Sequence, residues 1–321
     1  MLFPLAVLFR LVVAARRALY RHGVLAAARL PVPVIVVGNI SVGGTGKTPL
    51  TLWLIEYLRA QGYRPGVVSR GYGGTVAMPQ AVGIDSVPGQ VGDEPVLIAR
   101  RAGCPVWVGR DRVAAARALL QAHPEVDLLL SDDGLQHYRL ARDLEIAVVD
   151  GRRGLGNGLL LPAGPLREPR RRLATVDLVV VNDAPPEGAA GFAQHTYPMQ
   201  LAGSRFANLA DTVCSVGTEA FAGSVVHAVA GIGNPRRFFD HLRQLGIHAV
   251  EHPFPDHYAY HSSDFPYPDT EVVLMTEKDA VKCRQFARPH WWALAVEAQL
   301  QPEFGNRLLE KLRARNGSKA A

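Results

Sequence analysis

Residues 34–60 read VIVVGNISVGGTGKTPLTLWLIEYLRA. The first four residues are a β-branched run typical of a buried strand, and residues 50–60 have the pattern of a helix. Between them, Gly43 to Thr48 have the composition and the strand–loop–helix context of a phosphate-binding loop. In such a loop, backbone N–H groups and the helix N-terminus surround phosphate oxygens. The stretch therefore predicts a P-loop nucleotide-binding fold.

The residues of this loop have separate expected roles. Lys47 is expected to reach the β- and γ-phosphates of a nucleoside triphosphate, and Thr48 to ligate Mg²⁺. The phosphates are also expected to contact the rest of the loop: Gly43, Gly44, Thr45 and Gly46. The motif departs from G-x-x-x-x-G-K-[ST] at one position, because Ser41 stands where the first glycine would be. A chance glycine turn is the alternative interpretation.

A P-loop also needs an acidic group at the end of a neighbouring strand, to hold Mg²⁺ directly or through water. Residues 126–133, VDLLLSDD, provide a hydrophobic run that ends in Asp132 and Asp133. Two adjacent carboxylates at a strand end can also cap a helix or form a turn. Their combination with Lys47 favours the metal-binding interpretation.

Four further apolar runs, separated by helical or loop segments, predict a parallel α/β sheet with helices on both faces: 67–68, 106–108, 146–149 and 178–181. After a break at 182–188, we place a domain boundary near residue 205. The expected organisation is an amphipathic helix in 1–30 that belongs to the first domain, a P-loop core in 31–205, and a smaller α/β domain in 206–321. In the last of these, a strand at 225–230, a helix at 236–245 and a strand at 272–275 are expected.

The first thirty residues are rich in apolar side chains but carry arginines throughout. The longest uncharged run ends before Arg10, far short of the ~20 apolar residues that a membrane-spanning helix needs. On a helix, the arginines at 10, 17 and 21 would share one face, and the leucines and valine at 5, 8, 12 and 19 the opposite face. This pattern is typical of a helix at a membrane surface, or of an amphipathic helix packed on the domain.

The composition limits the class of protein. The chain has 321 residues, a formal net charge of +6 and an apolar fraction of 48%, which predict a globular protein with anionic partners. No nucleic-acid-binding motif accompanies the basic groups, so a phosphorylated ligand or lipid is favoured over nucleic acid. Three widely spaced cysteines indicate neither a disulfide framework nor a zinc site.

Several motifs in combination resemble the tetraacyldisaccharide 4'-kinase family, the lipid A kinases of Gram-negative bacteria. The resemblance runs from about residue 39 to about residue 282, and the motifs that carry it, in chain order, are GN at 38–39, GGTGKTP at 43–49, SRGYG at 69–73, GDEP at 92–95, DDGLQH at 132–137, LPAGPLRE at 161–168, DHY at 256–258 and TEKDA at 276–280. It implies transfer of the γ-phosphate of ATP to the 4'-hydroxyl of a tetraacylated glucosamine disaccharide 1-phosphate, producing lipid IV-A. It also implies peripheral association with the cytoplasmic face of the inner membrane, and we expect a monomer.

The same resemblance guides the assignment of a base, which must take the proton of the acceptor hydroxyl. Asp93 is the first choice, with His257 as the partner that orients it or adjusts its pKa; Asp132 is the rival base. A turn or cap role for Asp93 and a structural role for His257 are the alternatives. The resemblance also suggests that Glu168 approaches Mg²⁺, and a surface ion pair with neighbouring arginines is the alternative.

The remaining candidates are expected to surround the phosphates. Gln136 and His137 follow the acidic pair closely and are expected to contact phosphate or to position the metal ligands, with a structural role for His137 as the alternative. Arg110, Arg112 and Arg167 are expected to contact ATP or the 1-phosphate, because a guanidinium group suits phosphate oxygens.

Two other functions are compatible with a P-loop beside an amphipathic helix. A membrane-surface switch or partitioning ATPase usually carries a lysine just before the paired glycines, where this chain has Val42. A kinase of a soluble small molecule is the nearer alternative. A GTPase is disfavoured, because the lysine in TEKD at 276–279 is one position late for the usual guanine-binding motif.

Overall fold

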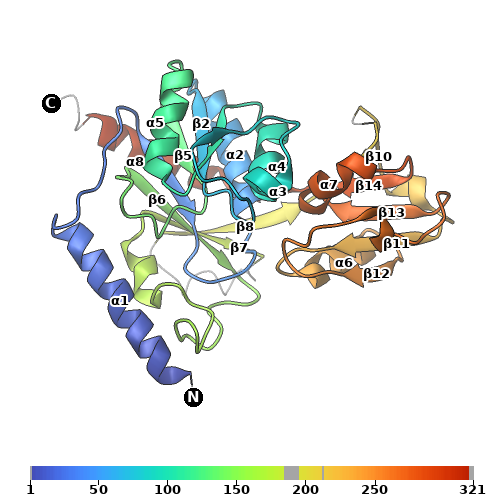
Figure 1. Cartoon of the computed structure of the whole chain (residues 1–321), viewed down its shortest axis with the longest axis horizontal. Helices are drawn as coiled ribbons and strands as arrows, with labels where there is room; N and C mark the ends of the chain where they lie inside the picture. The colour runs from blue at the N-terminus through green and yellow to red at the C-terminus, as the bar shows by residue number, and fades with distance from the viewer. Residues whose placement is uncertain (1, 184–194, 212, 318–321) are drawn as a thin grey trace.

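The computed structural model describes residues 2–183, 195–211 and 213–317, so that residues 184–188 of the expected break lie outside it. Two bodies lie side by side: a larger one built on a nine-stranded sheet and a smaller one built on a six-stranded sheet (Figure 1). We call them the core body and the second body.

The sheet of the core body has the order β15-β8-β7-β6-β1-β5-β2-β4-β3, and it is parallel from β8 to β4 with an antiparallel strand at each edge. Its strands are β1 Val34–Gly38, β2 Pro65–Ser69, β3 Gln80–Ala81, β4 Val106–Val108, β5 Leu128–Ser131, β6 Leu144–Asp150, β7 Leu178–Asn182, β8 Thr196–Ala202 and β15 Glu297–Leu300. Its helices are α1 Phe3–Arg21, α2 Lys47–Ala60, α3 Pro88–Val91, α4 Asp93–Ala102, α5 Arg112–Ala122 and α8 Pro302–Gly317. The predicted parallel α/β sheet is confirmed.

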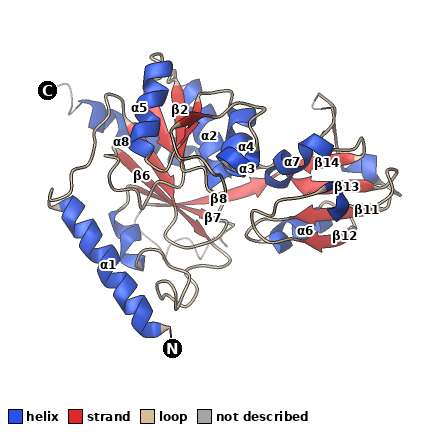
Figure 2. Ribbon diagram, in the orientation of Figure 1, coloured by secondary structure: helices blue, strands red, loops and turns tan. Residues whose placement is uncertain are grey.

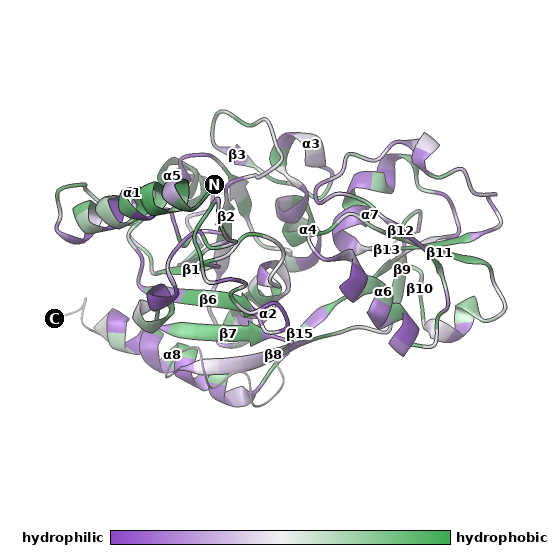
Figure 3. Ribbon diagram, turned by 90° about the horizontal axis from the view of Figure 1, so that it is seen from below, coloured by the Kyte–Doolittle hydropathy of each residue, from purple (hydrophilic) through white to green (hydrophobic). Residues whose placement is uncertain are grey.

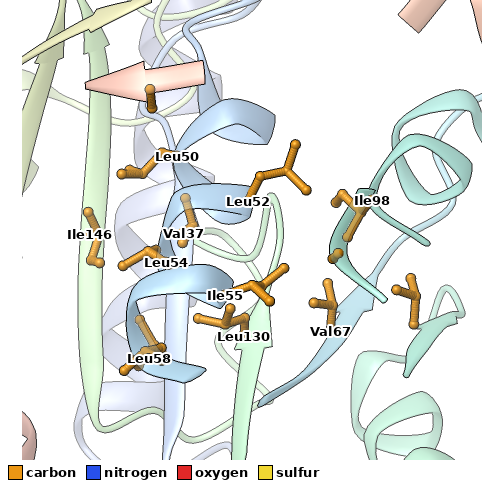
Figure 4. Close-up of a cluster of buried hydrophobic side chains, with 14 of the residues drawn as sticks. Val37, Leu50, Leu52, Leu54, Ile55, Leu58, Val67, Ile98, Leu130 and Ile146 are labelled. Carbon is orange, nitrogen blue, oxygen red and sulfur yellow. The ribbon is translucent and has the colours of Figure 1, made fainter. Parts of the chain in front are cut away.

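Helices cover both faces of this sheet because parallel strands are joined by crossovers. On one face, α2, α4 and α8 bury their apolar sides in a single cluster, in which Leu50, Leu54 and Leu58 of α2 lie against Val37 and Ile146 of the sheet (Figure 4). On the other face, α5 packs in a second cluster. The central strand β1 is therefore buried on both sides and leads into the glycine-rich loop from a fixed position.

The second body has the strand order β10-β9-β14-β13-β11-β12, with parallel pairing from β14 to β12 (Figure 2). Its strands are β9 Phe206–Asn208, β10 Ser215–Val216, β11 Val226–Ala230, β12 Val250–Pro253, β13 Val272–Thr276 and β14 Trp291–Leu294, and its helices are α6 Pro235–Gln244 and α7 Glu277–Cys283. The strands and the helix expected in this region are present within one or two residues of their expected bounds.

The chain returns to the core body before it ends, which differs from the expected extent of the second domain, 206–321. β15 pairs antiparallel with β8 at the edge of the first sheet. Along α8, the side chains of Phe304, Leu308 and Leu312 are fully buried in the core cluster beside α2. Two chain segments therefore connect the bodies, one after β8 and one before β15, and the apolar face of α8 explains why the end of the chain packs on the core body.

Helix α1 lies along the outside of the core body, and apolar residues alternate along it with polar ones (Figure 3). Only Ala6 of this helix is buried, whereas Phe3, Leu8 and Leu11 are each more than half exposed. The core body therefore leaves most of the apolar side chains of α1 exposed. No helix in the described part of the chain is long and apolar enough to cross a bilayer.

Candidate active site

The glycine-rich loop has the shape that phosphate binding needs. Gly43 and Gly46 adopt φ values of 94° and 95°, a region that side-chain-bearing residues rarely enter, and α2 begins directly after Gly46. The amide of Asn39 donates to the carbonyl of Gly43 and to Oγ1 of Thr45, each at 3.3 Å. Asn182, at the end of β7, donates to the carbonyl of Thr45 at 3.1 Å. These contacts hold the loop open at the carboxyl edge of the sheet.

The serine that replaces the first glycine has a structural explanation. Ser41 is buried and forms an antiparallel bridge with Leu166. The backbone N–H of Arg167 donates to the carbonyl of Ile40 at 2.7 Å. Residue 41 is thus in an extended pairing, which requires no glycine. The same pairing brings Arg167 and Glu168 to the P-loop.

Lys47, Asp133 and Arg167 lie together beside the loop. Nζ of Lys47 is 3.6 Å from Oδ1 of Asp133, and Nη1 of Arg167 is 3.2 Å from Oδ2. Burial acts to raise the pKa of Asp133, but the positive charges of Lys47, Arg167 and Arg112 outweigh it and hold this pKa below its ordinary value. Arg112 is buried and donates to the carbonyl of Asp133 at 2.7 Å, so it supports the acidic pair rather than facing the cavity.

Asp132 is fully buried next to this cluster. Its Oδ1 accepts a hydrogen bond from Thr51 at 3.3 Å, while its Oδ2 has no hydrogen-bond partner among the described residues. Burial, together with the negative charge of Glu94, raises the pKa of Asp132 to about 7. A buried carboxylate oxygen that lacks a hydrogen-bond partner is the environment that a bound cation would complete. The acidic pair therefore fits a divalent metal ion.

Glu168 is also fully buried, which excludes the surface ion pair considered above. Its carboxylate accepts hydrogen bonds from Gln136 at 2.8 Å and from the hydroxyl of Tyr138, and it forms an ion pair with Arg172 at 3.2 Å. Gln136 also donates to the carbonyl of Asn39, so the structure joins Gln136 and Glu168 to the base of the P-loop.

Two candidates are not brought to the phosphate-binding loop in the same way. Arg110 is exposed in the turn before α5. His137 is half-buried, and burial together with the charge of Arg112 lowers its pKa to about 4, so it is neutral at physiological pH. Its Nε2 is buried without a hydrogen-bond partner among the described residues. A neutral imidazole of this kind fits the structural alternative.

A cavity of about 560 Å³ lies between the two bodies and opens onto the P-loop. Its walls come from the loop and the start of α2, from β8, and from α6 and the start of α7: Gly44, Lys47, Leu201, Phe238, His241 and Lys278 are among them. A cavity of this size, lined by apolar side chains as well as by Lys47 and Lys278, suits a nucleotide.

Asp93 and His257 come together across the junction of the two bodies. Asp93 is the first residue of α4 in the core body, where the helix dipole favours a carboxylate. Nδ1 of His257 lies 2.9 Å and 3.1 Å from its two carboxylate oxygens. The sequence, in which these residues are 164 positions apart, suggested both but gave no evidence that they meet.

The protonation of this pair follows from its surroundings. The hydrogen bond to Asp93 raises the pKa of His257, against the effect of its partial burial. Burial acts to raise the pKa of Asp93, but the hydrogen bond from His257 and the charge of Lys278 hold that pKa below its ordinary value. Asp93 is therefore a carboxylate at neutral pH, and the imidazole beside it readily carries a proton.

Unusual backbone conformations occur in the same region. Among the described residues, the non-glycine positions with positive φ are Asp133, Asp183 and His257, with values of 47°, 59° and 60°. Asp133 and His257 are candidates from the sequence, and Asp183 lines the cavity. Such conformations cost about 1–3 kcal/mol each and tend to occur at functional sites.

The sequence interpretation missed two contributions of the second body. The turn before α6 touches the P-loop, so closely that a Cβ atom on Gly233 would lie 2.7 Å from the backbone nitrogen of Gly44. Arg237 on α6 reaches back to Asp150 and Asp183 of the core body at 3.0 Å and 3.6 Å. Nothing local in the sequence shows that the glycine-containing turn before α6 packs against the P-loop.

Comparisons with known proteins agree along nearly the whole chain. The family model described as tetraacyldisaccharide-1-P 4'-kinase matches residues 1–313. A tetraacyldisaccharide 4'-kinase from Azoarcus sp. strain BH72 is 53% identical over 97% of this chain and 91% of that protein, and the one from Chromobacterium violaceum is 52% identical over 99% and 95%. The crystal structure of LpxK from Aquifex aeolicus in complex with ATP superimposes with a TM-score of 0.83 at 30% identity, covering 96% of this chain and 98% of that one.

Proposed function

The chain belongs to the tetraacyldisaccharide-1-P 4'-kinase family, and from this we propose that its Asp93–His257 pair is the base of an ATP-dependent lipid kinase. Membership makes it a kinase that phosphorylates the 4'-position of the tetraacyldisaccharide 1-phosphate in lipid A biosynthesis, and the switch ATPase and soluble-substrate alternatives are not favoured. The observation that carries the proposal is the contact between the Asp93 carboxylate and the His257 imidazole, beside a cavity lined by Lys47.

In the proposed reaction, the 4'-hydroxyl oxygen forms a bond to the γ-phosphorus while the bond between the γ-phosphorus and the β–γ bridging oxygen breaks, releasing ADP. The hydroxyl proton passes to the carboxylate of Asp93. His257 stabilises the negative charge of Asp93 before the transfer and holds the carboxylate in place, since its Nδ1 contacts both oxygens. Asp132, the rival base, is disfavoured because its carboxylate is fully buried beside Thr51, whereas both oxygens of Asp93 are held by His257.

We further propose that the P-loop residues Gly43 to Thr48 bind the triphosphate. Lys47 contacts the β- and γ-phosphates, and in the absence of nucleotide Asp133 neutralises it. The hydroxyl of Thr48 and the carboxylates of Asp132 and Asp133 are the groups that would hold Mg²⁺, whereas the carboxylate of Glu168 is already engaged by Gln136, Tyr138 and Arg172. When bound, Mg²⁺ neutralises charge on the β- and γ-oxygens of ATP. The unsatisfied Oδ2 of Asp132 supports this assignment.

For the acceptor side, we propose that α1 places the enzyme on the lipid surface at the cytoplasmic face of the inner membrane. A row of exposed apolar side chains on this helix, among them Leu5, Leu8 and Val12, stands beside arginines that suit anionic lipids. The acyl chains of the substrate can then stay in the bilayer while the sugar enters the site.

The test is phosphate transfer from γ-labelled ATP and Mg²⁺ to a detergent-dispersed tetraacyldisaccharide 1-phosphate. Labelled lipid that requires Lys47 and Asp93, and whose phosphate is at the 4'-position, would support the proposal. Hydrolysis of ATP without labelled lipid would overturn it. Full activity of Asp93→Asn would show that Asp93 is not the base, while the assignment as a lipid kinase would still hold.

A further inference from the structure

Lys278, in the TEKDA motif, has no role in the reaction described so far. It is the second residue of α7 in the second body, and only 15% of its side chain is exposed. Its Nζ lies 3.0 Å from Asp256 in the same body and 3.1 Å from Glu94 in the core body. The same nitrogen lies 3.4 Å from Nε2 of His257. One ammonium group therefore contacts both bodies and the imidazole of the proposed base pair.

We propose that Lys278 is a positioning residue that opposes protonation of His257 at Nε2 and makes the charge on the imidazole depend on the contact between the two bodies. The inference rests on the proposed role of the Asp93–His257 pair. A lysine ammonium group has only hydrogens to offer, so the Nε2 atom facing it must present its lone pair. In a neutral imidazole the proton is then on Nδ1, directed at Asp93.

This arrangement determines what the pair can do. With Nδ1–H donated to Asp93, the imidazole supports the carboxylate in the orientation needed for proton transfer. With the other tautomer, two lone pairs would face each other and the contact would be lost. Glu94 holds Lys278 from the core body, so separation of the bodies would remove Glu94 from Lys278 and Asp93 from His257 together. The base pair is complete only when the cleft is closed.

His257 is surrounded by charges of both signs. Asp93 and Asp256 favour the imidazolium, Lys278 opposes it, and the ring of Tyr72 covers one side at a centroid distance of 5.0 Å. Lys278 also lowers the pKa of Asp93, with a smaller contribution from Lys282 on the same helix. Neutralising Lys278 should therefore raise the pKa of both members of the pair.

Arg101 provides a control that separates a general effect on the junction of the two bodies from an effect on His257. Arg101 on α4 pairs with Glu277 on α7 at 2.6 Å, so it joins the same two helices as the Glu94–Lys278 pair. The structure records no contact of Arg101 with the described residues of the base pair. Loss of Arg101 should remove one contact at the junction while the Glu94–Lys278 and Asp93–His257 contacts stay in place.

The experiment is ¹⁵N NMR of the histidine rings in the full chain, together with pH–rate profiles of lipid phosphorylation, for the wild type, Lys278→Met, Lys278→Arg and Arg101→Met. His257→Gln identifies the resonances. In the wild type, neutral His257 should carry its proton on Nδ1. Lys278→Met should raise the His257 pKa, while Asp93 keeps the proton of the neutral ring on Nδ1. It should also move the acid limb of kcat to higher pH and lower kcat at pH 7 by about tenfold.

Lys278→Arg should retain the wild-type titration of His257, because it retains the charge and the donors. Arg101→Met should leave the His257 resonances and the pH profile in place. Unchanged His257 resonances and an unchanged profile in Lys278→Met would overturn the inference. If Lys278→Met does not fold, Lys278→Gln takes its place, with the same expectations and the same overturning result. Full activity of Asp93→Asn and His257→Gln would instead refute the proposed base pair, whatever the Lys278 variants do.

Discussion

Nδ1 of His257, in the second body, lies 2.9 Å from Oδ2 of Asp93, at the N-terminus of α4 in the core body. Each group reaches this contact from a special backbone position: His257 has a φ of 60°, and Asp93 follows Gly92, which has a φ of 93°. The contact also crosses the junction of the two bodies, so the proposed catalytic pair exists only in the folded arrangement of both.

The first prediction concerns this pair. Asp93→Asn should lower kcat by about 10²- to 10⁴-fold, the usual contribution of a general base, with a small effect on KM for ATP. His257→Gln should lower kcat less, because the carboxylate remains. The double variant should be little worse than Asp93→Asn alone, since the two groups act as a unit. Additive effects of the two substitutions on kcat would show that they act separately.

The pH dependence of stability has a predictable sign. The raised pKa of His257 contributes stability that is complete below its unfolded pKa of 6.5 and is lost as pH rises through the folded value. The lowered pKa of Asp93 contributes stability above 3.8 that is lost as pH falls through its folded value. His257→Gln should therefore cost most between pH 3.8 and 6.5. Urea unfolding of both proteins at pH 5.5 and pH 9 measures this, and an equal cost at both values would contradict it.

Lys47→Ala should abolish most phosphate transfer. The loss of one cationic donor at the triphosphate is expected to reduce kcat by about 10²- to 10³-fold, comparable with the removal of an oxyanion-hole donor. The fold should survive, because Asp133 keeps its ion pair with Arg167. Lys311→Ala is the matched control, because Lys311 lies on α8 of the core body and contacts Asp177. A comparable loss of kcat in the control would point to general damage instead.

Arg237→Ala should weaken the junction of the two bodies. Arg237 faces Asp150, which is almost completely buried, and its removal leaves that carboxylate with weaker compensation. A cost of about 1–3 kcal/mol in the free energy of unfolding is expected, measured by urea denaturation. The adjacent Arg236 is exposed, so Arg236→Ala should change stability by less than about 0.5 kcal/mol. The prediction fails if the two variants behave alike.

Replacing Leu8 and Leu11 on α1 by glutamate should abolish sedimentation with vesicles that contain anionic phospholipid. Both side chains are about 60% exposed, so the substitution removes apolar contact with lipid and adds repulsion without disturbing the core. Thermal unfolding should be unchanged. Arg10→Gln should weaken binding only to anionic vesicles, which separates the electrostatic contribution from the apolar one. Retained binding of the glutamate variant to anionic vesicles would show that another surface makes the membrane contact.

Much of the core body could be predicted from local patterns. The run at 34–37, the glycine loop and the helix after it form a signal in one continuous stretch, and β1, the P-loop and α2 lie where that signal placed them. The proximity of Lys47 and Asp133 follows from the same logic, because the carboxyl ends of adjacent parallel strands meet at one edge of a sheet. These predictions depend on interactions between residues close in sequence or on a general rule of sheet geometry.

The tertiary structure alone decided how distant segments meet. The return of β15 and α8 to the core body, the contact of Gly233 with Gly44, and the positions of Arg237 and Lys278 at the junction leave no mark in the local sequence pattern. The sequence by itself determined the nucleotide-binding loop and its acidic partners, since short-range backbone preferences and strand order suffice for them. The Asp93–His257–Lys278 arrangement required the packing of two bodies, because residues 164 and 184 positions away from their partners are brought together only by burial of the surfaces between them.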